Sequence, residues 1–173
     1  MAFAVDMPWS RRSATVVAAG LNSAGVPHVE IAALRDGTAW VVPFMADLCA
    51  RNKPMAVTLD PAGPAGALLA ELTQAKVPVT GTTGRAYGQA CGAFLDAVTS
   101  KRLAHRHERA LDDAVSGAIK RFTGDHFIWD RKAGIDISPL VAATLARWAF
   151  TAAPPESSPG FVDLSDFLDD DDW

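Results

Sequence analysis

The chain has 173 residues, of which 49% are hydrophobic and 21% are charged. This length suffices for one domain with its own hydrophobic core, and this composition excludes a disordered polyampholyte and an integral membrane protein. The formal net charge of −4, taken alone, argues against a nucleic-acid partner.

That net charge is a sum over two unlike parts. From Pro155 onwards the chain holds seven of its 20 acidic residues and no lysine or arginine, so residues 1–154 carry 13 acidic residues against all 16 basic ones. The body therefore has a net charge of +3 and the C-terminal segment one of −7. This asymmetry suggests a body that binds a polyanion, and a tail that does not or that competes for the same surface.

The first third of the chain predicts an antiparallel meander followed by a helix. Apolar strands with short connections are expected at Ala2–Val5, Ser13–Ala19 and Val26–Leu34. Apolar residues then recur three and four positions apart between Thr38 and Arg51, which is the period of a helix.

The middle of the chain predicts a parallel strand–helix–strand unit. Its elements are expected at Pro54–Leu59, Gly66–Ala75 and Val77–Thr80. Two further helices are expected at Gly84–Ser100 and Ala110–Phe122, and short strands at Leu103–Arg106 and His126–Trp129.

The last helix is predicted to begin at Ser138 and Pro139, with serine as the N-cap and proline at the first helical position. Residues 154–160 have the composition of a linker. We therefore expect one domain over residues 1–150 and an acidic, flexible tail over residues 151–173. No membrane partner is expected, because no stretch reaches about 18 consecutive apolar residues.

Three aspartates are candidate metal ligands. Asp6 and Asp60 each follow an apolar strand at the point where the chain leaves it, and Asp136 lies just before the last helix. If the two strands pair side by side, both carboxylates open on one edge of the sheet, and a helix packing across that edge can bring Asp136 to them. Oxygen ligands without histidine or cysteine favour Mg²⁺ or Mn²⁺, and two such ions support phosphodiester cleavage. From the residues alone, each aspartate fits an ordinary turn equally well.

Several segments resemble the C-terminal nuclease domain of the large terminase subunits of actinobacteriophages. They are WVVPF at 40–44, VTLDPAGPAG at 57–66, ACGAFLDAV at 90–98, LDDAVSGAIKR at 111–121 and WDRKAGIDISPLVAATLARW at 129–148. The resemblance runs over residues 2–150 and implies a ribonuclease-H-like α/β fold. That fold is a mixed sheet, with three antiparallel strands and then parallel strands, flanked by helices.

The resemblance also implies an activity. The family cuts concatemeric double-stranded phage DNA during genome packaging, with two Mg²⁺ or Mn²⁺ ions held by acids that fall on Asp6, Asp60 and Asp136. It implies a packaging ATPase domain, a portal and a small terminase subunit as partners, in the cytoplasm of the bacterial host. Because the sequence has no phosphate-loop motif, we expect an excised nuclease domain without its ATPase.

Other polar residues leave alternatives open. Asp130 is an alternative or additional metal ligand beside Asp136. Basic residues that would contact DNA phosphates, or else form a solvated surface, are Arg11, Arg12, Lys101, Arg102, Arg106, Arg131 and Lys132. No motif would read base edges, so cutting should be largely independent of sequence.

His105 and His107 fit exposed polar positions, or a role in water activation or phosphate contact. Two other functions also stay open for the chain: a non-catalytic DNA-grip or portal-docking module, and a ribonuclease-H-like junction resolvase.

Overall fold

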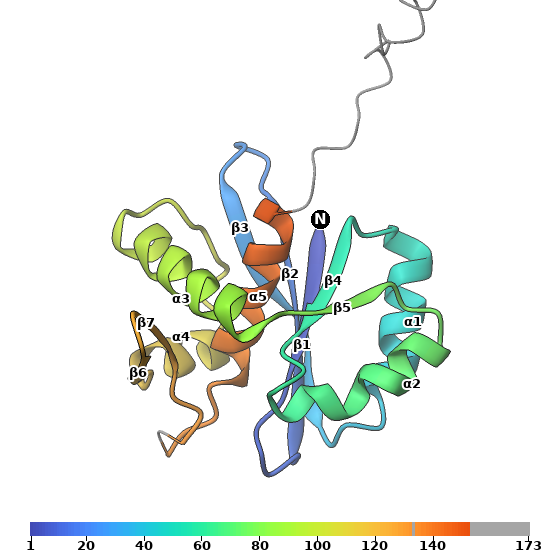
Figure 1. Cartoon of the computed structure of the whole chain (residues 1–173). Coiled ribbons are helices and arrows are strands. Elements are labelled where there is room, and N and C mark those ends of the chain that lie inside the picture. The colour runs from blue at the N-terminus through green and yellow to red at the C-terminus, as the bar shows by residue number, and fades with distance from the viewer. Residues whose placement is uncertain (133, 153–173) are drawn as a thin grey trace, which may run out of the picture.

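A five-stranded mixed sheet runs through the middle of the molecule (Figure 1). The computed structural model describes residues 1–132 and 134–152. The strands are β1 (Ala2–Asp6), β2 (Ser13–Leu21), β3 (Pro27–Asp36), β4 (Ala56–Leu59) and β5 (Val79–Gly81), in the order β3-β2-β1-β4-β5. β1, β2 and β3 are antiparallel neighbours, whereas β4 and β5 run parallel to β1. This confirms the predicted fold class of three antiparallel strands and then parallel strands, flanked by helices.

Two hydrophobic cores lie on opposite faces of this sheet. On one face, α1 (Val41–Asn52), the 3₁₀ turn η1 (Pro64–Leu68) and α2 (Leu69–Gln74) bury Met45 and Leu72 against Val5 and Val57. On the other face lie α3 (Gly84–Thr99), α4 (Arg109–Ser116) and α5 (Ser138–Ala152). The alternation of side chains along each strand divides the apolar residues between the two cores.

Helix α5 is buried between the sheet and the two helices α3 and α4 (Figure 1). The sequence predicts a single apolar stripe on this helix. In the structure the small residues Ala142, Ala143 and Ala146 on its remaining surface are also buried, because other helices cover that side. A helix that is apolar on all sides is typical of such an enclosed position.

The region between α4 and α5 differs from the prediction. The helix expected over Ala110–Phe122 ends at Ser116, and Gly117 follows as its C-cap. The chain then forms a two-stranded antiparallel ribbon of β6 (Lys120–Thr123) and β7 (His126–Trp129), joined through Gly124 at φ 59°. The helical prediction needed Ile119 and Phe122 in the apolar stripe, but both are more than half exposed, so burial gives a continued helix no advantage.

Two smaller predictions are also wrong. Leu103–Arg106 forms no strand of its own and contributes only an isolated bridge from Ala104 to His28 of β3. Ser138 is not the N-cap of the last helix, because α5 begins at Ser138 itself. Its hydroxyl is hydrogen-bonded to Thr15 Oγ1 of β2, 3.1 Å away. The predicted tail over 151–173 lies outside the described residues, apart from the last two residues of α5.

No helix within the described part of the chain is long and apolar enough to cross a lipid bilayer.

The end of β7 is attached to α5 by a buried hydrogen bond, which a mutation can test. Trp129 Nε1–H donates to Thr144 Oγ1 at 2.9 Å, and the Thr144 hydroxyl donates to Leu140 O. Thr144→Val leaves the indole N–H without a partner, so the free energy of unfolding should fall by about 1–3 kcal/mol in denaturant titrations. Thr151→Val is the control: its hydroxyl makes the same bond to its own helix at an exposed position, so little change is expected. Equal losses from the two variants would contradict this role of the bond.

Candidate metal centre

Asp6 and Asp60 lie side by side at the carboxyl ends of two neighbouring parallel strands. Asp6 is the last residue of β1, and Asp60 directly follows β4. Ala4 pairs with Thr58, so two residues further along both aspartates stand at the same level and on the same face of the sheet. Neighbouring strands are about 4.8 Å apart, which brings the two carboxylates within reach of one cation. Both are buried, with exposures of 0% and 6%.

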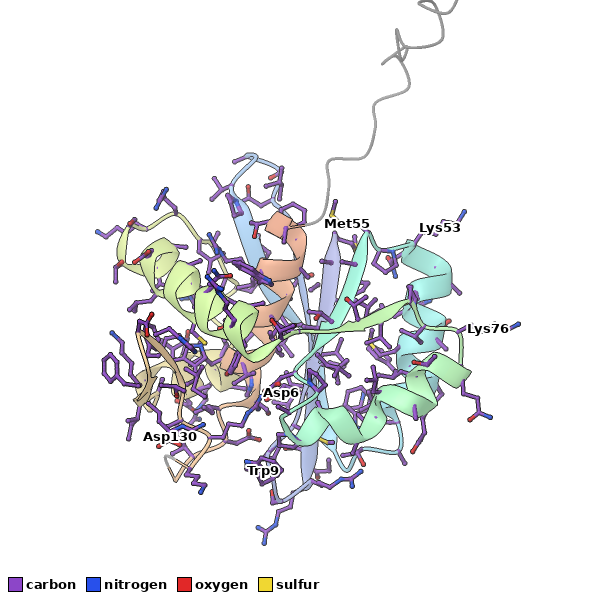
Figure 2. All side chains as sticks on the ribbon, in the orientation of Figure 1. Asp6, Trp9, Lys53, Met55, Lys76 and Asp130 are labelled. Carbon is purple, nitrogen blue, oxygen red and sulfur yellow. The ribbon has the colours of Figure 1, made fainter. Side chains whose placement is uncertain are left out.

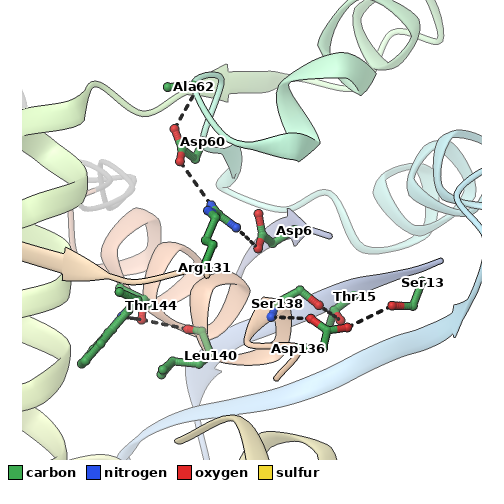
Figure 3. Close-up of polar contacts among 11 residues, drawn as sticks. Asp6, Ser13, Thr15, Asp60, Ala62, Arg131, Asp136, Ser138, Leu140 and Thr144 are labelled. Atoms are coloured by element: carbon green, nitrogen blue, oxygen red, sulfur yellow. Dashed lines mark hydrogen bonds and ion pairs between the residues drawn. The ribbon is translucent and has the colours of Figure 1, made fainter. Parts of the chain in front are cut away.

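The side chain of Arg131 occupies the space between these carboxylates (Figure 3). Its Nη1 donates to Asp6 Oδ2, and its Nη2 donates to Asp60 Oδ2 at 3.2 Å. The arginine comes from the segment after β7, and its side chain is only 12% exposed. The sequence predicts a DNA contact for this residue, whereas the structure points it inward as the counter-ion of the two aspartates.

Burial dominates the electrostatics of Asp6. The pKa of its carboxyl group is raised to about 7, mainly because burial removes its hydration. The charge and the hydrogen bond of Arg131 lower this pKa, and the negative charge of Asp60 raises it, but both effects are smaller than that of burial. Asp6 Oδ1 is buried and has no hydrogen-bond partner within the described residues. A buried carboxylate oxygen without a donor is costly unless a proton or a cation satisfies it.

Gly63 and Tyr87 complete the surroundings of Arg131, and the sequence did not identify either. A Cβ atom at Gly63 would lie 2.8 Å from Arg131 Nη2 and 2.8 Å from Asp60 Oδ2, so only glycine admits this ion pair in its present geometry. The guanidinium carbon of Arg131 lies 6.0 Å from the ring centroid of Tyr87, which is buried on α3. The one available signal was a glycine three residues after an acid, in the DPAG segment.

Asp136 is held near this pair but does not touch it. Its Oδ2 accepts from Ser13 Oγ at 3.0 Å and its Oδ1 accepts from the N–H of Ser138 at 2.8 Å. Ser138 in turn bonds Thr15, which stands opposite Asp6 in the β1–β2 ladder (Figure 3). Over residues 1–132 and 134–152, no hydrogen bond or ion pair joins Asp136 to either of the other two aspartates. The structure thus brings two of the three predicted ligands together and places the third, which is exposed, two residues before α5.

Two adjoining clefts are lined by the other aspartates, whereas Asp6 is fully buried beneath them. One, of about 540 Å³, includes Asp60 and Asp130 in its lining, and the other, of about 510 Å³, includes Asp136. Trp9, Arg131 and Lys132 line both. Asp130 accepts the N–H of Lys132 at 3.0 Å and makes no bond to Arg131 in the described structure. Figure 2 shows Asp6, Trp9 and Asp130 toward one end of the molecule, away from Lys53 and Met55.

The predicted DNA-binding residues divide into two groups. Arg12 and Lys132 line the clefts, and Arg11 lies in the same β1–β2 turn as Arg12 with a φ of 54°. Arg121 also lines the cleft of Asp60.

The second group lies beyond the far end of α3. The first residue of α3 lines the cleft, and its 16 residues span about 24 Å. Lys101 and Arg102 follow its last residues, and Arg106 Nε lies 2.8 Å from the carboxylate of Glu30.

Among the comparisons with known proteins, the one with solved structures finds similar proteins. No protein-family model matches the chain, and no curated protein matches it. Among solved structures, the large terminase of bacteriophage HK97 superposes with a TM-score of 0.67 at 14% identity, covering 85% of this chain and 38% of that one. This chain thus spans well under half of the length of the HK97 protein.

Two isolated nuclease domains superpose over most of their own length. The large terminase nuclease from thermophilic phage G20c with bound cobalt has a TM-score of 0.59 at 15% identity, covering 84% of this chain and 79% of that one. A mutant nuclease domain of the large terminase subunit gp2 of bacterial virus Sf6, with manganese, has a TM-score of 0.53 at 12% identity, covering 84% and 86%. The chain therefore has the ribonuclease-H-like fold of large terminase nuclease domains, as the sequence resemblance predicted.

The role of Arg131 as a buried counter-ion predicts a stability effect. Arg131→Gln leaves two adjacent buried carboxylates without a positive charge, so the free energy of unfolding in a chelator-containing buffer should fall by about 3–5 kcal/mol. Loss of the guanidinium raises the pKa of Asp6 further above its unfolded value, so the folded variant retains a proton that the unfolded chain releases. The difference in free energy of unfolding between the wild type and Arg131→Gln should therefore grow as the pH rises above 7. Lys132→Gln, at the exposed neighbouring residue, should change stability by no more than about 0.5 kcal/mol. A deficit that does not depend on pH would contradict this electrostatic origin.

Proposed function

We propose that this chain is a metal-dependent endonuclease domain that cuts concatemeric double-stranded DNA during phage genome packaging. The observation that carries the proposal is the pair of buried carboxylates on adjacent strand ends, Asp6 and Asp60. One of their buried oxygens has no hydrogen-bond partner among the described residues. The shared fold adds support, since structures with this fold have been solved with cobalt, magnesium and manganese.

The donor set fits two Mg²⁺ or Mn²⁺ ions. Asp6, Asp60 and Asp136 would hold them, with Asp130 as the alternative or additional ligand, and all four offer the hard oxygen atoms that these cations prefer. Such ions, when bound, activate a water molecule and stabilise the leaving oxygen in phosphodiester hydrolysis. The unpartnered Oδ1 of Asp6 is the position at which a cation would satisfy a buried acceptor.

Arg131 has two roles in this proposal. For Asp6 and Asp60 to bind metal, the guanidinium has to leave their outer oxygens. It lines both clefts, so the same side chain can turn toward a phosphate of bound DNA. The predicted DNA contact of Arg131 and its observed ion pairs thus belong to two states of one residue.

DNA would lie across the clefts. Arg11, Arg12 and Lys132 would contact its backbone beside the site, and Lys101, Arg102 and Arg106 would contact it about 24 Å away, a distance of about seven base pairs. Contacts of this kind position the duplex without reading its sequence. In the assembled motor, the partners would be the packaging ATPase domain, the portal and the small terminase subunit, in the cytoplasm of the bacterial host.

Loss of either central carboxylate tests the catalytic proposal. Asp6→Asn and Asp60→Asn should each lower the rate of plasmid cleavage in Mn²⁺ by more than about 100-fold, because loss of even an indirect support of a metal ligand costs 10–100-fold. Asp47→Asn removes the same charge from an exposed helix position paired with Arg51 and should cut at the normal rate. Undiminished cutting by both site variants, with the fold intact by circular dichroism, would refute the assignment.

A non-catalytic DNA-grip or portal-docking module is the second candidate. It is favoured by the ion pairs of Arg131 with Asp6 and Asp60, which resemble those of a structural charge cluster. Wild-type protein that binds plasmid DNA in Mg²⁺ and Mn²⁺ but leaves it uncut would favour this module over the nuclease.

Arg12 and Lys132, two of the basic residues that line the clefts, predict a salt effect. Arg12→Gln and Lys132→Gln should each weaken binding to duplex DNA of any sequence and reduce the slope of log affinity against log salt concentration by about 1. Arg51→Gln, a matched change on α1 where the arginine pairs with Asp47, should leave the slope unchanged. The slopes can be measured by fluorescence anisotropy in Ca²⁺ or chelator, and three equal slopes would contradict the proposed path of the DNA.

A further inference from the structure

Two histidines and an aspartate form a second cluster of possible metal ligands. It lies beyond the C-terminal end of α3, whereas the Asp6–Asp60 pair lies near the N-terminal end of that helix. His105, His107 and Asp112 each present one ligand atom, and these three atoms lie within 4.8 Å of one another. His105 Nδ1 is 3.6 Å from Asp112 Oδ1, and the centroids of the two imidazole rings are 4.4 Å apart. The three residues come from two segments of the chain, the loop after α3 and the first turn of α4.

The backbone around the cluster is held in place on both sides. Ala104 N–H donates to Pro27 O at 2.9 Å, and Ala104 O accepts from Val29 N–H at 3.0 Å, so β3 holds the residue before the cluster. Glu108 Oε1 accepts the N–H of Ile31 on the same strand at 3.0 Å. Asp112 lies one helical turn after Glu108 and donates its N–H to Glu108 O. The ligand atoms thus stand on a common frame rather than on a free loop.

The conformation of His107 brings the two rings together. Its φ of 58° lies in the left-handed region, which non-glycine residues rarely adopt. This turn directs the N–H of His107 to Nδ1 of His105 at 3.2 Å. An Nδ1 that accepts this bond carries no proton, so Asp112 Oδ1 faces it with lone pairs only.

The neighbouring arginines do not neutralise Asp112. Arg106 pairs with Glu30 at 2.8 Å, and Arg109 pairs with Asp113 at 3.5 Å. Within the described residues, Asp112 has His105 as its only ion-pair partner, and then only if that imidazole is protonated. A cation held by the two imidazoles and the carboxylate would balance the charge of Asp112. At Nδ1 of His105 it would take the place of the His107 N–H, because that nitrogen has a single lone pair.

We propose that His105, His107 and Asp112 form a binding site for a single Zn²⁺ ion. Bonds of about 2.0–2.2 Å in tetrahedral geometry place neighbouring ligand atoms about 3.4 Å apart, close to the 3.6 Å already present between His105 and Asp112. Two imidazoles and one carboxylate suit zinc, whereas the all-carboxylate set of Asp6 and Asp60 suits Mg²⁺ or Mn²⁺. The exposed side of His107 leaves the remaining coordination position open to solvent.

The site binds zinc independently of any nuclease activity. It clamps the basic segment from Lys101 to Arg109 onto α4, and the ion adds positive charge to that surface. Zinc should therefore raise the melting temperature of the protein, since a ligand that binds only the folded state stabilises it.

Zinc titration by calorimetry in a large excess of Mg²⁺ tests the site while Mg²⁺ competes at the carboxylates of Asp6 and Asp60. The wild-type chain should take up one Zn²⁺, and His107→Gln and Asp112→Asn should each weaken that binding at least tenfold. Asp113→Asn removes the same charge one residue further along α4, from a side chain that pairs with Arg109, and should bind zinc as the wild type does. Circular dichroism checks that each variant is folded.

Long-range ¹H–¹⁵N spectra of the wild type give a readout that does not depend on variants. Zinc should shift the ring nitrogens of His105 and His107 and leave those of His28 and His126 unchanged. The proposal is overturned if the wild type takes up no zinc, if both ligand variants bind as tightly as Asp113→Asn, or if the shifts fall on His28 or His126.

Discussion

The parallel pairing of β1 with β4 is the constraint on which the rest of the molecule depends. It sets Asp6 and Asp60 at the same level on one face of the sheet, where like charges repel unless a cation lies between them. The arrangement has consequences for its surroundings: a glycine at position 63, a buried arginine from the segment after β7, and a cleft above them. The meander of β2 and β3 completes the sheet on one side of β1, and Thr15 of β2 extends the polar contacts toward Asp136.

The two candidate cation sites differ in the chemistry they offer. The Asp6–Asp60 centre is buried, is built from oxygen atoms at strand ends, and is paired with one internal guanidinium. The cluster of His105, His107 and Asp112 lies at the surface, combines nitrogen with oxygen, and has no arginine among its described contacts. Because the two sites differ in ligand type and in burial, each would select a different ion.

Local pattern predicted the strands of the sheet and the two strand-end aspartates, whereas the mixed sheet that brings these strands together was implied by the family resemblance. Short apolar runs that end in aspartate place the carboxylates, and alternation along the strands sets the face. It failed where the outcome depends on contacts between distant segments. Phe122 fits the period of a helix, but no helix or strand of the described part covers it, so pairing with β7 prevails. Arg131 and Lys132 look equivalent in sequence, and only the approach of β7 to the strand ends turns one inward and leaves the other exposed. Ser138 fits an N-cap, but it is the first residue of α5, and Thr15, 123 residues earlier, engages its hydroxyl.

Helix α5 contacts both Asp136 and the segment that leads to Arg131, although these two residues share no hydrogen bond or ion pair in the described structure. Its first residue bonds Asp136, and Thr144, two turns further along, holds Trp129 just before Asp130 and Arg131. The position of α5 relative to the sheet therefore affects both the distance of Arg131 from the two carboxylates and the position of Asp136. Substitutions in the buried alanines of α5 would move these two groups together, so natural variation in this core can adjust them only as a unit.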